Sequence, residues 1–196
     1  MRRGIWAGIL TCAMALGVVG CWNPFSPDGG NGNGHPIGDR TSPDNLLEFF
    51  AVAYEDKSLE RYTESLDDSY SFTFMEADYE SAGVSKDRPY WGKTEDVERT
   101  ESMFTSADTK AISFDFGLPI MPWYYCPDSI YVDDHWQAVD GFCCIRKPDI
   151  KVDVDDPQKG FTTYWVKGSW LEITVIEDRL NAGLWTILRI RESLEP

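Results

Sequence analysis

The spacing of apolar residues changes along this chain, and that change constrains the fold more than any other feature. Ser42 and Pro43 form a typical helix start, and Leu46, Phe50 and Tyr54 follow at helical spacing. Later in the chain apolar and polar residues alternate, which is the period of a half-buried strand. Helices gathered ahead of strands predict an α+β fold with an antiparallel sheet.

The spacing predicts the order helix, helix, strand, helix, and then four or so long strands. Helices are expected over residues 42–54, 58–66 and 94–104, and strands over residues 70–74, 112–116, 129–145, 150–154, 161–177 and 184–191.

The amino terminus has the pattern of a secretion signal. Arg2 and Arg3 precede a fifteen-residue, largely apolar run over residues 5–19. A membrane-spanning helix needs about 20 such residues, so the run has the length of a signal peptide instead. It ends in Val-Val-Gly20-Cys21, which resembles the lipobox of bacterial lipoproteins. That resemblance implies cleavage after Gly20 and a diacylglycerol on Cys21; an ordinary cleaved signal is the alternative.

The sequence therefore predicts three parts: a signal peptide over residues 1–20, a lipidated tether over 21–41 and one α+β domain over 42–196. The tether is rich in Gly, Asn and Pro, and a flexible coil of this length reaches about 25 Å. The expected location is the bacterial cell envelope. Trp22 after the lipidated cysteine favours the outer membrane in a diderm organism.

The charge limits the partners that this chain can have. A formal net charge of −15 repels phosphate backbones, so nucleic acid is not an expected partner. The expected partners are the lipid bilayer, through acylated Cys21, and an unknown small molecule or envelope protein.

Three segments resemble the nuclear transport factor 2-like superfamily, whose α+β cone is also called SnoaL-like or cystatin-like. Residues 45–74 are similar to its first two helices and first strand, residues 91–104 to its third helix, and residues 183–192 to its last strand. The resemblance implies a strongly curved antiparallel sheet wrapped around about three amino-terminal helices, with a possible pocket at the open end.

Enzymes on this fold, such as ketosteroid isomerases and polyketide cyclases, use acidic, Tyr, His or Arg side chains in that pocket. No local motif here carries such a role over. Asp115 is one weak candidate, because burial in the cone would raise its pKa towards that of a general base. His135, which follows two acids, is the other. Simple solvent exposure is favoured for both.

Other chemical signals are sparse. Arg189 and Arg191 either bind an anionic ligand or balance nearby acids. No zinc spacing, EF-hand loop or glycine-rich phosphate loop is present, so no metal or cofactor is expected. Export permits a disulfide from Cys126 to Cys143 or Cys144, worth about 3 kcal/mol, with the remaining cysteine buried.

Two functions fit these residues. The favoured one is a tethered, non-catalytic binding or interaction module. The alternative is a small-molecule enzyme of the cyclase or isomerase kind that uses a pocket carboxylate. A buried Asp–His or Asp–Tyr pair facing a ligand-sized cavity would count heavily against the first.

Overall fold

The computed structural model describes residues 39–132, 135–166 and 169–193. The leader, Cys21 and almost all of the tether lie outside these residues. The helices are α2 (Pro43–Glu55), α3 (Leu59–Glu64), the 3-10 turn η1 (Glu76–Asp78), α4 (Tyr79–Ala82) and α5 (Lys93–Thr105). The strands are β1 (Leu66–Thr73), β2 (Tyr90–Gly92), β3 (Thr109–Asp115), β4 (Tyr124–Tyr125), β5 (Asp128–Val132), β6 (His135–Val139), β7 (Gly141–Arg146), β8 (Asp149–Asp156), β9 (Gly160–Val166), β10 (Trp170–Glu177) and β11 (Trp185–Ser193).

Helix α2 begins where the sequence predicts. The Ser42 hydroxyl accepts a hydrogen bond from the backbone N–H of Asn45 at 3.2 Å, and Pro43 takes the first helical turn. The apolar stripe of the helix is buried, with Leu46 and Ala53 fully inaccessible. This stripe anchors the helix on the core.

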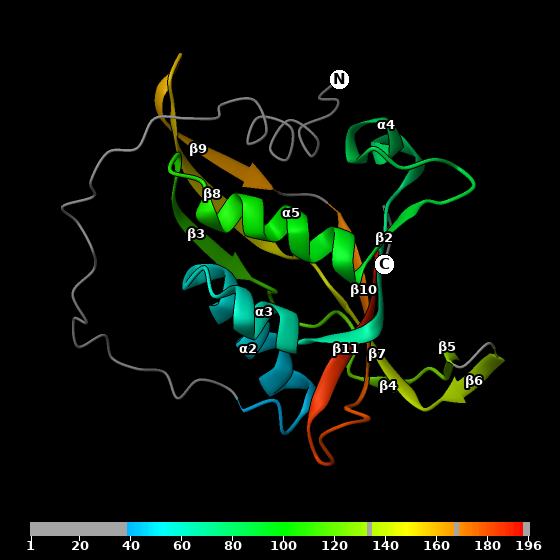
Figure 1. Ribbon diagram of the computed structural model, residues 1–196. Helices are drawn as coiled ribbons and strands as arrows, with labels where there is room; N and C mark the ends of the chain where they lie inside the picture. Colours follow the sequence, from blue (N-terminus) through cyan, green and yellow to red (C-terminus); the bar gives the residue numbers. More distant parts are fainter. Residues whose placement is uncertain (1–38, 133–134, 167–168, 194–196) are drawn as a thin grey trace.

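The strands form three sheets in the described residues. The largest has the order β2-β1-β11-β10-β7-β4, the second is β3-β8-β9, and the hairpin β5-β6 stands apart (Figure 1). The α+β prediction is confirmed. The largest sheet is not entirely antiparallel, because its strands β1 and β11 pair in parallel. These two strands come from opposite ends of the domain, so no tight turn between them imposes an antiparallel direction.

Each of the two longest predicted strands contains more than one strand of the structure. The run expected over 129–145 contains β5, β6 and most of β7, and the run over 161–177 contains β9 and β10. The apolar periodicity of one strand continues into the next, so spacing alone does not show where one strand ends and the next begins.

Helices α2, α3 and α5 lie together in front of the strands and contact the walls formed by β1, β3 and β11 (Figure 1). The main core fills the space between these layers and is rich in aromatic rings. The rings of Phe50 and Phe114 meet edge to face, with centroids 5.6 Å apart, and so join α2 to β3. Among the described residues, no helix is both long and apolar enough to cross a membrane.

Candidate functional site

A small cavity lies between helix α5 and the strands of the core. Its volume is about 130 Å³, and its walls are mostly aromatic, with Phe50, Phe74, Trp91 and Phe114 among them. An engineered apolar cavity of about 150 Å³ in another protein holds one benzene molecule. The space under α5 therefore fits a ligand with roughly one ring.

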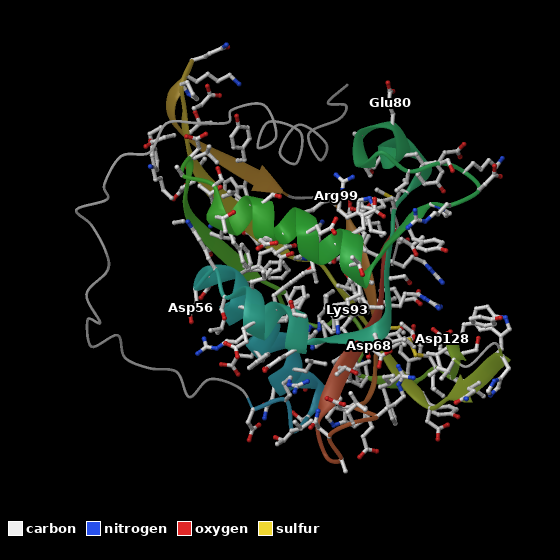
Figure 2. All side chains as sticks on the ribbon, in the orientation of Figure 1. Asp56, Asp68, Glu80, Lys93, Arg99 and Asp128 are labelled. Atoms are coloured by element: carbon white, nitrogen blue, oxygen red, sulfur yellow. A yellow bond between two sulfur atoms is a disulfide. The ribbon has the colours of Figure 1, made fainter. Side chains whose placement is uncertain are left out.

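Helix α5 supplies most of the polar side of this cavity. Asp96, Arg99, Thr100 and Met103 all line it, and their spacing of three, four and seven residues places them on one helix face. Asp96 and Thr100 are buried, and the Arg99 side chain remains 23% exposed. Arg99 lies on the side of α5 that faces α4 (Figure 2). One face of one helix thus carries a carboxylate, a hydroxyl and a guanidinium to the same space.

Asp96 is a buried carboxylate with a tyrosine partner. Only 6% of the residue is exposed, and its Oδ2 accepts a hydrogen bond from the Tyr62 hydroxyl at 2.6 Å. Burial raises the pKa of Asp96 to about 6, although hydrogen bonding from Tyr62 and Tyr70 and the charge of Arg99 act in the opposite direction. Near neutral pH this group can therefore both accept and release a proton.

Three tyrosines from three different elements surround this carboxylate. Tyr54 comes from α2, Tyr62 from α3 and Tyr70 from β1, and all three line the cavity. The Tyr54 hydroxyl interacts with those of Tyr62 and Thr100. Burial, together with the charge of Asp96, raises the pKa of each tyrosine above its usual value. The tyrosines therefore stay protonated and act as hydrogen-bond donors.

Residues 75–92, here called the cap, lie beside the cavity, and Trp91 of this segment lines it. The Trp91 indole Nε1 donates to the carbonyl of Ala82 at 3.1 Å, which ties α4 to the cavity wall. Gly83 ends α4 with a φ of 70°, and a Cβ there would lie 3.7 Å from Nη2 of Arg99. Arg99 consequently sits beneath the end of α4, between the cavity and the cap.

A second buried acid lies beside the cavity. Glu192 on β11 is 5% exposed and pairs in register with Leu171, which lines the cavity. Its Oε2 accepts from the backbone N–H of Met75 at 3.3 Å, and its Oε1 has no hydrogen-bond partner among the described residues. Burial raises the pKa of Glu192 to about 7, and the charge of Asp78 acts in the same direction.

The structure places the two predicted catalytic candidates away from the cavity. Asp115 is exposed at the end of β3, where its Oδ1 accepts from the backbone N–H of Gly117 at 2.7 Å. Strand alternation turns Phe114 inward and Asp115 outward, so the carboxylate that faces the cavity is Asp96 instead. His135 is exposed at the start of β6 and hydrogen-bonds with the Gln137 side chain.

The other predicted groups also lie outside the cavity. Arg189 pairs with Asp128 at 2.7 Å and Arg191 with Glu172 at 3.7 Å, so both arginines balance nearby acids. In the part of the chain that the structure describes, no three His, Cys, Asp or Glu side chains are arranged to hold a metal ion.

The structure joins Cys126 and Cys143 in a disulfide, with their Cα atoms 5.7 Å apart. The bridge connects the segment between β4 and β5 to β7. Cys144 is free and fully buried on the opposite face of β7, and burial raises its pKa to about 11. This thiol is accordingly protonated and unreactive near neutral pH.

Sequence reasoning missed Asp96 and its tyrosines. An acid in the first turn of a helix, as Asp96 is, is ordinarily explained by stabilisation of the helix start, and Tyr54 and Tyr62 lie within apolar stripes. One signal was available, since Asp96, Thr100 and Met103 share a helix face at spacings of four and seven residues. An acid on the inward face of an amphipathic helix indicates a buried carboxylate, and this pattern could have identified the site.

Comparisons with known proteins give a likeness in fold only. No family model matches the chain, and neither does any curated protein. A conserved protein from Planctomyces limnophilus is 12% identical over 76% of this chain and 89% of its own, with a TM-score of 0.47. A nuclear transport factor 2-like superfamily protein from Salmonella enterica serovar Typhimurium is 8% identical over 76% and 84%, with a TM-score of 0.46. A ketosteroid isomerase-like protein from Erwinia carotovora atroseptica is 11% identical over 78% and 94%, with a TM-score of 0.44. At these identities none of the three says what this chain does, so a functional argument has to rest on the geometry around Asp96.

Proposed function

We propose that this chain is a small-molecule enzyme that transfers a proton between Asp96 and a ring-sized substrate held in the cavity under α5. The single observation that supports this most is a buried carboxylate, hydrogen-bonded by Tyr62, that faces an apolar cavity of about 130 Å³. A buried Asp–Tyr pair beside a ligand-sized cavity is the arrangement that argues against a purely passive binding module.

The proposed chemistry follows from the surroundings of the carboxylate. Above pH 6 Asp96 is mostly ionised and accepts a proton from an acidic C–H or O–H of the substrate. The walls are mostly aromatic, and apolar surroundings strengthen each electrostatic interaction in the cavity. The protonated carboxyl then returns the proton at another atom of the substrate, as an isomerase requires. The tyrosines hold the Asp96 carboxyl in one orientation throughout.

The test uses a simple carbon acid that fits the cavity. We expect the protein to speed the exchange of the α-hydrogens of cyclohexanone for deuterium in D₂O, followed by NMR. Asp96→Asn should lower this rate by about 10²- to 10⁴-fold, the usual contribution of a general base. Asp115→Asn and His135→Ala are matched controls that should leave the rate unchanged. Equal rates for the wild type and a folded Asp96→Asn protein would contradict the proposal.

A tethered binding module without catalysis is the second candidate, and one contact favours it. The Asp96 carboxylate already accepts a hydrogen bond from Tyr62 at 2.6 Å. In the non-catalytic alternative, the sole role of this hydrogen bond is to join α5 to α3. In that case cyclohexanone should bind the wild type and Asp96→Asn with the same affinity, and neither protein should speed the exchange of the α-hydrogens of cyclohexanone.

We also propose that the domain is attached to the bacterial cell envelope by a lipid on Cys21. The charged, apolar leader that ends at Gly20 supports this, and a disulfide between Cys126 and Cys143 is compatible with an oxidising compartment. Mass spectrometry of the protein from its native cells should find a chain that begins at an acylated Cys21. A chain with its leader intact, or with Cys21 unmodified, would contradict the proposal.

A further inference from the structure

Among the described residues that line the cavity, two carry a formal charge, Asp96 and Arg99, and their partners differ. Asp96 is hydrogen-bonded by tyrosine. Arg99 forms an ion pair with Glu95, whose Oε1 lies 3.6 Å from Nη2, beyond the usual hydrogen-bond distance. The other carboxylate oxygen of Glu95, Oε2, lies closer to Arg88, at 3.1 Å. Arg99 therefore shares Glu95 with Arg88 and forms the longer of the two ion pairs.

The Arg99 guanidinium stacks over the ring of Trp91. The guanidinium carbon lies 4.2 Å from the centroid of the Trp91 ring. Stacking of this kind occupies only a face of the guanidinium, whose N–H groups lie along its edges. Those edges match the two oxygens of a carboxylate, which a guanidinium binds in a bidentate manner.

Asp96 and Arg99 line the same cavity from positions three residues apart on α5, so one small ligand can contact both side chains. A ligand with its ring against the aromatic walls and its carboxylate at Arg99 would thus present a ring atom to Asp96.

We propose that Arg99 is an anion-binding residue and that the ligand of this cavity is a small aromatic or alicyclic carboxylate. This inference rests on the proposed function, because it names the class of substrate for the same cavity. Arg99 lines the cavity and remains partly exposed, so its guanidinium can contact a ligand there.

Such a ligand would also couple binding to the protonation of Asp96. A carboxylate at Arg99 adds a negative charge near Asp96, and a like charge favours the protonated form of the carboxyl. Binding should therefore take up a proton, and affinity should fall as pH rises from about 5.5 to 7.5. Arg99 and Glu95 are the other charged groups whose fields act on Asp96.

Benzoate and benzamide have the same ring but differ in charge, so a comparison of their affinities measures the contribution of the charge. Isothermal titration of the full chain should show benzoate binding about 10- to 100-fold more tightly than benzamide, as expected for a charge-assisted hydrogen bond in place of a neutral one. Arg99→Gln should remove this preference by weakening benzoate alone, and Arg99→Lys should restore part of it. Arg88→Gln is the matched control, because Arg88 shares Glu95, is 61% exposed and does not line the cavity.

The outcomes distinguish this inference from the proposed function. If both probes bind the wild type equally, the cavity is a ligand site but Arg99 does not select anions. If Arg99→Gln weakens both probes equally while retaining its thermal stability, Arg99 only holds the cap in place. Either result overturns the inference and leaves proton transfer by Asp96 standing. If neither probe binds, the inference and the proposed ring-sized substrate both fail.

Discussion

Replacing Glu192 by Gln should stabilise this protein at alkaline pH. The Glu192 side chain is 5% exposed, its Oε1 accepts no hydrogen bond among the described residues, and the nearby Asp78 is also acidic. Charging Glu192 in this place is therefore unfavourable, and the hydrogen bond from the Met75 backbone N–H to Oε2 offsets only part of the cost. A glutamine has the same shape and cannot ionise.

The magnitude follows from the pKa. In the unfolded chain a glutamate ionises at about 4.5, and in the folded protein Glu192 ionises at about 7. At about 1.4 kcal/mol per pKa unit, the wild type should lose about 3 kcal/mol of stability as pH rises through this range. The sign is that of an acid with a raised pKa: the folded state holds its proton longer, so stability falls from pH 4.5 to 7 and stays low above it.

Urea unfolding at pH 4.5, 6 and 8 measures this effect. The free energy of unfolding of Glu192→Gln minus that of the wild type should increase by about 3 kcal/mol from the lowest to the highest pH. The pH-dependent change isolates the ionisation, because any fixed cost of burying the amide is the same at each pH. Glu80→Gln is the control and should show no such trend, because the Glu80 side chain is exposed on α4 (Figure 2). A difference that stays constant with pH would refute the reasoning.

Three further perturbations test contacts around the cavity and the disulfide. Tyr62→Phe removes the donor at 2.6 Å and should raise the pKa of Asp96 above about 6, as measured by carboxyl NMR; an unchanged or lower pKa would contradict the contact. Trp91→Phe should cost about 1–3 kcal/mol in urea unfolding, because the buried Ala82 carbonyl loses its indole donor, and a neutral result would show that water replaces it. Reduction of the Cys126–Cys143 bridge, which spans 17 residues of sequence, should cost about 3 kcal/mol, and Cys126→Ser should become insensitive to reductant; a wild type unaffected by reductant would argue against the bridge.

The elements of the fold were predictable because local rules determine them. Ser42 and Pro43 mark the start of α2, and the hydrogen bond from Asn45 to Ser42 is the one that such a start requires. The parallel pairing of β1 with β11 was not predictable in this way. It joins Leu66 to Ile187, residues far apart in the chain, and no turn or spacing encodes that contact.

The candidate site was less predictable than the fold, for a related reason. Asp96 and Tyr62 are 34 residues apart, and they meet only because α3 and α5 pack on the same side of β1. Each residue taken alone has an ordinary explanation, as a helix-start acid or as part of an apolar stripe. The prediction of Asp115 used the right principle, since a buried carboxylate has a raised pKa, but strand alternation exposes that residue.

The packing of α3 and α5 that brings Asp96 and Tyr62 together also determines the pKa of Asp96. An acid on the inward face of α5 would ordinarily be selected against, because its charge is costly to bury. Here Tyr62 and Tyr70 reduce that cost without removing it, and the pKa of Asp96 is raised only to about 6. A carboxylate with more donors would stay ionised and hold no proton at neutral pH, and one with fewer would stay protonated. The tyrosines thus leave Asp96 close to the point where it can both take and return a proton.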